Sequence, residues 1–294
     1  MDQVSSSKSM LTDANKVTDV VFVIHGIRDE GYWTRKIASR VQRAGKQHDS
    51  KRVIAAETSS YGYFPMLSFL RPGAREDKVE WLMDRYTEAR AMYPKANFHF
   101  VGHSHGTYLL AKSLQDYPAV RFDQVVFAGS VVQREYEWHK FIPSRVKFVL
   151  NFVATADWVV AFFPNALQTI GIQDLGSAGH DGFEAANTQP RVIQPAKTYI
   201  VGGHSAALQE AMWDSIAEFT VTGKFQLPPD ALRSDKQAWW VAYPAKVAPL
   251  IWVVVAGLLG WVLYLLLSLR IREWIKTLVI IIYLAVIWIV LTEV

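Results

Sequence analysis

Short apolar runs alternate with longer amphipathic segments along most of the chain, beginning at about residue 17. Residues 20–24 read Val-Val-Phe-Val-Ile, and a continuous run of this kind predicts a strand buried on both faces. Similar runs predict strands over 53–58, 97–101, 124–128, 146–154 and 197–201. Amphipathic segments predict helices over 33–44, 77–92, 107–115 and 205–219. This alternation is typical of an α/β domain with a mostly parallel sheet.

Two stretches interrupt the alternation. Residues 59–73 are aromatic and contain two prolines, which predicts an ordered loop. Its residues 61–67 either line an acyl-binding cleft or serve ordinary core or lid packing. Residues 164–195 are rich in glycine, glutamine and asparagine and have no clear period. A long irregular stretch inside an α/β domain is usually functional, and we interpret this one as a lid.

The C-terminal part of the chain is strongly apolar. Residues 247–269 contain no charged residue, and as a helix they span about 34 Å, enough to cross hydrocarbon about 30 Å thick. Residues 278–291 form a second, shorter run, which we expect to cross only with bilayer thinning or snorkelling by Lys276. Tryptophan and tyrosine side chains suit an interfacial belt, and candidates are Trp239, Trp240, Tyr243 and Trp252. The alternative is a buried helical hairpin of a soluble core.

These patterns divide the chain into four parts. Residues 1–17 form a polar tail, residues 18–223 the α/β domain, residues 224–243 a linker with an interfacial segment, and residues 244–294 a membrane-anchoring hairpin. The polar N-terminal part lacks the apolar stretch of a secretory signal, so we expect no conventional export.

Composition narrows the chemistry. The chain has 294 residues, no cysteine and a formal net charge of +4. The lack of cysteine excludes a disulfide framework, a thiolate nucleophile and any cysteine-based metal site. Lys and Arg do not cluster with aromatic residues, so we expect no nucleic-acid partner.

The strongest motif is Gly102-His103-Ser104-His105-Gly106, which matches Gly-x-Ser-x-Gly. A predicted strand precedes it and a predicted helix follows it, which is the context that a nucleophile elbow requires. The glycines allow the tight packing of a strained turn, and the turn presents the serine hydroxyl above the sheet. Ser104 is therefore the candidate nucleophile.

A serine hydroxyl needs a base to take its proton, and the base needs an orienting acid. Asp157 and His204 each follow a predicted strand, where the sites of α/β sheets assemble. We assign His204 as general base and then acid, and Asp157 as the group that orients it. Glu135 is the main rival for the acid. His103 and His105 flank Ser104 and are too close to it in sequence to reach its hydroxyl as a base. We interpret His25, His99, His139 and His180 as structural or surface residues.

These residues, in this order, resemble the α/β-hydrolase superfamily on its lipase/esterase side, over about residues 17–223. The resemblance implies acyl transfer to water through a serine ester, without metal or other cofactor. Backbone N–H groups should stabilise the oxyanion. One donor is expected from His105, after the nucleophile, and the other from Ile27, which follows His25-Gly26.

The expected function is hydrolysis of carboxylic esters, with a lipid or other acyl ester as substrate and a membrane as partner. Two alternatives stay open: a thioesterase or protein deacylase at the membrane, and a membrane-inserting toxin or effector whose hydrolase domain is secondary. We expect the domain on the cytoplasmic face. A hairpin that crosses fully would place Arg270, Arg272 and Lys276 outside, against the positive-inside tendency, and delivery by a dedicated secretion system is the alternative.

Overall fold

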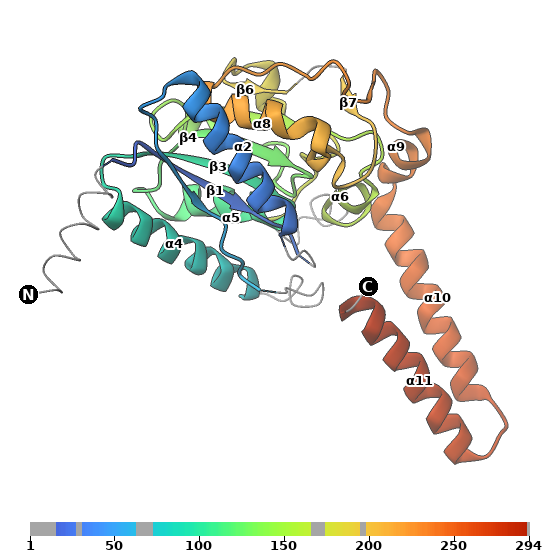
Figure 1. Cartoon of the computed structure of the whole chain (residues 1–294). Helices are drawn as coiled ribbons and strands as arrows, with labels where there is room; N and C mark the ends of the chain where they lie inside the picture. Colours follow the sequence, from blue (N-terminus) through green and yellow to red (C-terminus); the bar gives the residue numbers. More distant parts are fainter. Residues whose placement is uncertain (1–15, 28–30, 63–72, 166–173, 195–197, 293–294) are drawn as a thin grey trace, which may run out of the picture.

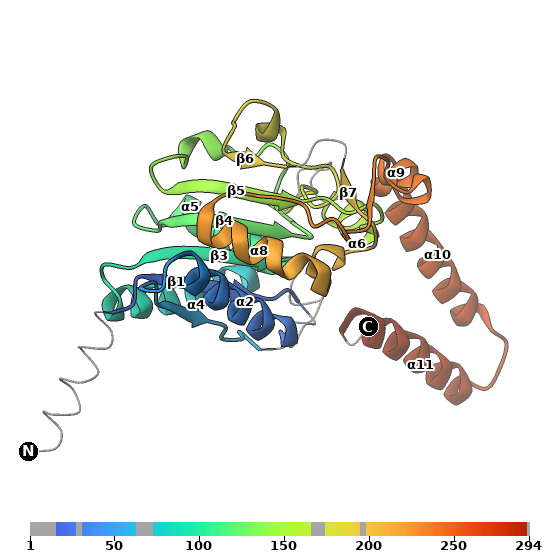
Figure 2. The same cartoon turned by 45° about the horizontal axis from the view of Figure 1, so that its top comes forward.

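The computed structural model describes residues 16–27, 31–62, 73–165, 174–194 and 198–292 (Figure 1). Residues 63–72 of the predicted aromatic loop and residues 166–173 of the predicted lid lie outside this part of the chain. The domain is a parallel sheet with helices on both faces, followed by two long helices that project from it (Figures 1 and 2).

The main sheet has six parallel strands in the order β2-β1-β3-β4-β5-β6. Their bounds are β1 Asp19–Ile24, β2 Ile54–Glu57, β3 Asn97–His103, β4 Phe122–Ala128, β5 Val146–Phe152 and β6 Val192–Ile193. The strand order reverses at β1, which has β2 on one side and β3 on the other. In open α/β sheets, ligands bind at the carboxyl ends of the strands beside such a reversal.

Helices cover both faces of the sheet. Every residue of β1 is therefore buried, although alternate side chains point to opposite sides of the sheet. Val20, Phe22 and Ile24 join the core under α4 (Ala74–Met92) and α5 (His105–Asp116). Val21 and Val23 join the core under α2 (Tyr32–His48) and α8 (Glu210–Thr222). The sheet is thus the middle layer of a three-layer α/β domain, with helices packed on both of its faces.

The end of the sheet contains a strand that the sequence did not indicate. β6 is the sheet's sixth strand. The strand predicted over 197–201 is present at residues 199–200 as β7 (Tyr199–Ile200), which pairs antiparallel with β8 (Arg233–Ser234), and a single bridge to Ala154 connects it with the end of β5. A strand of two residues, as β6 is, leaves no periodicity in the sequence to detect.

The segment after α8 packs against the domain. Val201 N–H donates to the Leu232 carbonyl at 2.9 Å, next to the β7–β8 pair. The side chain of Gln237 donates to the His180 carbonyl at 2.6 Å. Helix α9 (Trp239–Ala245) follows and packs against α6 (Trp158–Phe162), the short helix after β5.

Two apolar helices follow α9: α10 (Ala248–Ser268) and α11 (Glu273–Thr292). By length and composition, both helices could cross a membrane. Over 18 residues the mean hydropathy reaches 2.5 in α10 and 2.1 in α11, and none of the residues in either window is buried. Helix α11 doubles back beside α10, and the Tyr283 hydroxyl donates to the Leu259 carbonyl at 2.7 Å (Figure 1). The second helix begins at Glu273, earlier than the apolar run over 278–291 indicated, so it is nearly as long as the first.

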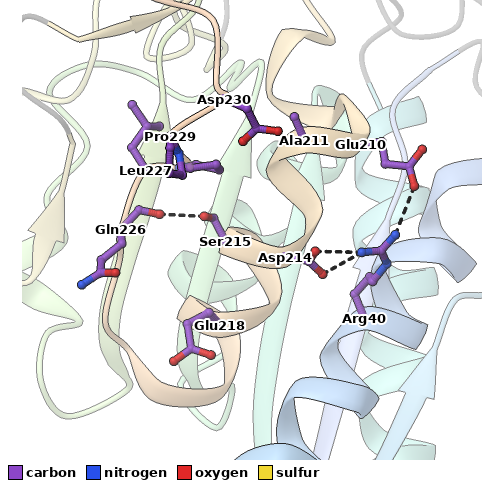
Figure 3. Close-up of a pocket in the computed structure, with 11 residues that line it drawn as sticks. Arg40, Glu210, Ala211, Asp214, Ser215, Glu218, Gln226, Leu227, Pro229 and Asp230 are labelled. Atoms are coloured by element: carbon purple, nitrogen blue, oxygen red, sulfur yellow. Dashed lines mark hydrogen bonds and ion pairs between the residues drawn. The ribbon is translucent and has the colours of Figure 1, made fainter.

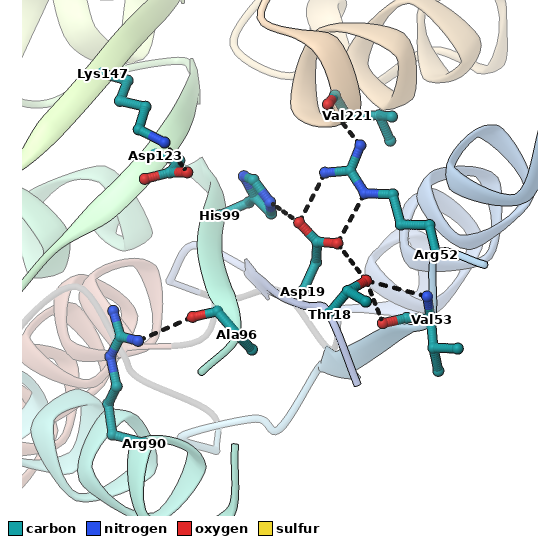
Figure 4. Close-up of polar contacts among 10 residues, drawn as sticks. All are labelled: Thr18, Asp19, Arg52, Val53, Arg90, Ala96, His99, Asp123, Lys147 and Val221. Carbon is teal, nitrogen blue, oxygen red and sulfur yellow. Dashed lines mark hydrogen bonds and ion pairs between the residues drawn. The ribbon is translucent and has the colours of Figure 1, made fainter. Parts of the chain in front are cut away.

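A buried polar network joins the amino ends of β1 and β3 (Figure 4). The Arg52 guanidinium donates to both carboxylate oxygens of Asp19 at 2.7 Å, and His99 Nε2 donates to one of them at 2.9 Å. Burial alone would raise the pKa of Asp19, but hydrogen bonds from His99, Arg52 and Thr18 outweigh burial and hold that pKa far below its ordinary value. This network lies at the opposite end of the strands from Ser104 and stabilises the sheet.

Candidate active site

Ser104 occupies a strained turn between β3 and α5. Its φ of 51° makes it the one non-glycine residue with positive φ in the described part of the chain. A Cβ on Gly106 would lie 2.6 Å from the Ile24 carbonyl oxygen, and a Cβ on Gly102 would lie 3.2 Å from the backbone of Gly106. Glycine is therefore required on both sides of the serine. Strain of this kind is found where a side chain has to be presented for function.

Hydrogen bonds hold this turn in place. Ser104 N–H donates to the Ala128 carbonyl at 3.0 Å, which ties the turn to the end of β4. The Thr107 hydroxyl donates to the Ser104 carbonyl at 2.6 Å and accepts from Val131 N–H at 3.2 Å. Thr107 is a site residue that no sequence motif indicated. Its position three residues after the serine, at a helix start, is the local pattern that could have indicated this role.

Asp157 lies at the carboxyl end of β5 and is fully buried. Its Oδ1 accepts from Val160 N–H at 3.1 Å, so the side chain caps α6. Burial alone would raise the pKa of Asp157, but attraction to His204, together with hydrogen bonds from His204 and Val160, outweighs burial and lowers the pKa. The group is thus a carboxylate at neutral pH.

His204 faces Asp157. Its Nδ1 lies 3.0 Å from both carboxylate oxygens, and because a carboxylate can only accept, Nδ1 carries the hydrogen. Ala156 N–H donates to the Gly202 carbonyl at 2.9 Å, which joins the loop of the acid to that of the histidine. His204 also packs on Gly129, where a Cβ would lie 2.8 Å from the imidazole. This tautomer leaves Nε2 able to accept a proton.

His204 contacts the residue before Ser104, and in the described part of the chain no hydrogen bond joins Ser104 Oγ to His204 Nε2. The ring of His103, the residue before the serine, has its centroid 4.8 Å from that of His204, and its Nε2 lies 3.4 Å from the His204 carbonyl oxygen. The structure therefore brings Asp157 and His204 into contact and places the imidazole beside the turn. Contacts between a nucleophile and its base are often longer in a free enzyme than in its substrate complex. Glu135, the rival acid, lies half exposed beside Arg134.

The two residues expected to supply oxyanion donors adjoin Ser104. His105 is the first residue of α5, and the N–H groups of a first helical turn have no partner inside the helix. Ile27 follows Gly26, and a Cβ on Gly26 would lie 2.7 Å from the Ser104 Cβ and 3.3 Å from its Oγ. The lack of a side chain on Gly26 thus lets residues 25–27, the Ile27 loop, approach the nucleophile. The helix dipole also favours negative charge at this position.

Buried aromatic and histidine side chains support the Ile27 loop. His25 bonds to the Ser60 hydroxyl through Nε2 at 2.7 Å and stacks on Tyr61 with ring centroids 4.6 Å apart. The His105 ring is fully buried between Tyr61 and Tyr108. Burial and nearby positive charge lower the pKa of His105 well below its ordinary value, so its side chain is neutral. These two histidines are structural, and the sequence analysis did not identify Tyr61 as their partner.

One surface pocket, of about 650 Å³, lies between α8 and residues 226–230, and Arg40 of α2, which pairs with Glu210 and Asp214, also lines it (Figure 3). Its lining residues include none of the candidate catalytic residues. A second pocket, of about 580 Å³, is lined by the start of α2 and by the end of β2 and the segment after it, including Ser60. Because Ser60 bonds to His25, this second pocket adjoins the Ile27 loop.

No family model and no curated protein sequence matches this chain. Among solved structures, it is similar to LpqC, a poly(3-hydroxybutyrate) depolymerase from Bordetella parapertussis, with 17% identity over 72% of this chain and 81% of that chain and a TM-score of 0.43. A predicted CIB-like hydrolase from Thermoplasma acidophilum has 14% identity, coverage of 69% and 84%, and a TM-score of 0.37. A cutinase-like protein from Cryptococcus sp. has 11% identity, coverage of 70% and 94%, and a TM-score of 0.36. The roles of individual residues rest on the geometry described above.

Proposed function

We propose that this protein is a membrane-associated serine hydrolase that cleaves carboxylic ester bonds of lipids. The observation that carries the proposal is the strained Ser104 turn at the same sheet edge as a histidine held by a buried carboxylate. A positive φ at a serine between a strand and a helix is strained and does not stabilise the fold. Such a turn serves to expose the serine hydroxyl to a substrate and to a base.

The proposed reaction follows from the positions of these groups. His204 Nε2 takes the hydroxyl proton as Ser104 Oγ attacks the ester carbonyl carbon, and the carbonyl oxygen becomes an oxyanion held by the N–H groups of Ile27 and His105. Collapse of this intermediate breaks the C–O bond, and the imidazolium returns the proton to the leaving alcohol. Water then attacks the acyl-enzyme with the same proton transfers and releases the acid. Asp157 stabilises the imidazolium in both steps.

Loss of activity in Ser104→Ala tests the catalytic proposal. Purified full-length protein in detergent should react with a fluorophosphonate probe and hydrolyse short p-nitrophenyl esters and phospholipids, and Ser104→Ala should do neither. Ser215→Ala is a matched control, because its hydroxyl lies on α8 and donates to the Gln226 carbonyl far from the site. Equal inertness of the wild type and Ser104→Ala towards the probe and a broad ester panel would refute the proposal. Comparison of oxygen esters with thioesters separates the lipase function from a thioesterase.

The membrane part of the proposal rests on α10 and α11. Their outward side chains are large and apolar, and an exposed apolar surface of this extent needs a nonpolar environment. Trp239, Trp240 and Tyr243 are exposed on α9, immediately before the first apolar helix, where an aromatic belt would contact lipid headgroups. An anchored domain meets membrane lipids at high effective concentration, which favours lipid esters as substrates.

The same proposal places the catalytic domain on the cytoplasmic face. A hairpin that crosses twice returns the chain to the side from which it started, so the residues before α10 and after α11 share one face. Protease added to right-side-out vesicles should then leave the domain intact and degrade it only after the vesicles are opened. Degradation in sealed vesicles would instead support delivery from outside by a dedicated secretion system.

A further inference from the structure

Helix α6 carries the catalytic acid at its N-cap, yet it has only five residues, Trp158–Phe162. A helix this short has too few internal hydrogen bonds to be stable on its own. The position of Asp157 therefore depends on what packs against α6.

The root of the hairpin supplies that packing. Ala161 of α6 is buried in a small cluster with Val241 and Ala245 of α9. One turn into α10, the Trp252 indole N–H donates to the Phe162 carbonyl at 2.9 Å, and its ring meets the edge of Phe163 with centroids 5.9 Å apart. The last carbonyls of a helix have no partner within it, so the indole caps the C-terminal end of α6.

The other side of the acid is held as well. Ala238 N–H, just before α9, donates to the Thr155 carbonyl at 2.8 Å, two residues before Asp157. The loop that carries the acid is thus held between the histidine loop on one side and the root of the hairpin on the other. Figures 1 and 2 show α6, α9 and the start of α10 together at one edge of the domain.

We infer that Trp252 is a positioning residue for Asp157, so that the orientation of the catalytic acid depends on how the first membrane helix is held. This inference rests on the proposed Ser104–His204–Asp157 chemistry. The indole is partly exposed in the free chain, and in a bilayer it would lie in the interfacial layer, where tryptophan is favoured. Reduced access of water there strengthens the hydrogen bond to Phe162. Membrane insertion and catalytic geometry are therefore coupled.

Trp252→Phe tests the coupling, because it keeps an aromatic ring and removes only the donor. Trp261→Phe is the matched control, since Trp261 is an exposed residue of the same helix. The wild type and both full-length variants are reconstituted in phosphatidylcholine–phosphatidylglycerol vesicles, and hydrolysis of p-nitrophenyl butyrate is followed against substrate concentration. We expect Trp252→Phe to lower kcat about five-fold, the change that corresponds to one neutral hydrogen bond, with KM unchanged.

The split between kcat and KM separates positioning from simple destabilisation. A displaced Asp157 should lower kcat per folded molecule and leave KM unchanged, because no group that binds the substrate has moved. Trp261→Phe should match the wild type in kcat and in KM. If Trp252→Phe also matches it, the inference is wrong, whereas a wild type that does not react with the fluorophosphonate probe refutes the catalytic proposal itself. Should Trp252→Phe unfold, Asn165→Ala removes a 3.2 Å bond to the Ala245 carbonyl and is expected to act in the same direction.

Discussion

Replacing Asp157 by asparagine should leave the fold intact and remove nearly all activity. The carboxylate makes two kinds of contact: Oδ1 accepts from Val160 N–H at 3.1 Å, and both oxygens lie 3.0 Å from His204 Nδ1. Asparagine caps a helix about as well as aspartate, so its oxygen can stay on the Val160 N–H. Its amide NH₂ group then replaces Oδ2 and faces Nδ1 as a donor.

This exchange reverses the tautomer of the histidine. A donor opposite Nδ1 turns that nitrogen into an acceptor, so the hydrogen moves to Nε2, which can then no longer accept the Ser104 proton. Asp-to-Asn substitution in a serine-protease triad lowers kcat by about 10⁴ for this reason. We expect a loss of about 10³ to 10⁴ in kcat here, or about 4 to 5.5 kcal/mol in activation free energy. The retained cap limits the change in unfolding free energy to less than about 1 kcal/mol.

Two measurements check this prediction: kcat for a p-nitrophenyl ester between pH 6 and 9, and the urea midpoint of unfolding. Asp19→Asn is the matched control, because Asp19 belongs to a second buried His–Asp pair, with His99, at the opposite end of the strands. It should destabilise the fold and leave kcat per folded molecule within about two-fold of wild type, since no reacting group is touched. A stable Asp157→Asn variant that keeps more than about a tenth of the wild-type kcat would refute the reasoning.

Three further predictions follow from the packing. Gly106→Ala places a Cβ 2.6 Å from the Ile24 carbonyl oxygen, so it should lower the unfolding free energy by about 1–3 kcal/mol in urea titrations and slow probe labelling of Ser104. Because the fold lowers the pKa of Asp19, its stabilisation is present above the unfolded-chain pKa of about 3.9 and is lost as the pH falls through the folded value. Asp19→Asn should therefore flatten the acid side of the plot of urea midpoint against pH, and an unchanged slope would contradict this. A carbonate wash of membranes should leave the full chain in the pellet and release a chain that ends at Lys246; release of both would exclude an inserted hairpin.

Residue patterns alone indicated the features of this protein that depend on neighbouring residues. A buried strand, the Gly-His-Ser-His-Gly turn and the helix after it are visible in adjacent residues, and within the turn a Cβ on Gly102 would lie 3.2 Å from the Gly106 backbone. Exposed apolar helices are local too, since length and composition alone make a segment able to cross hydrocarbon. These features indicated the fold class and Ser104 without any knowledge of distant contacts.

Tertiary structure decided what depends on residues far apart in the chain. The two-residue strand β6 exists only because β5 lies beside it, and a pattern so short carries no signal. The sequence favoured Asp157 over Glu135, but the contact of its carboxylate with His204 joins loops after separate strands, and only the folded chain shows it. The contact of Trp252 with the end of α6 joins residues 90 positions apart, and no local propensity encodes such a pair. Hydrogen bonds between distant segments arise from packing of the whole chain, so only the folded molecule reveals that the acid and the hairpin are joined.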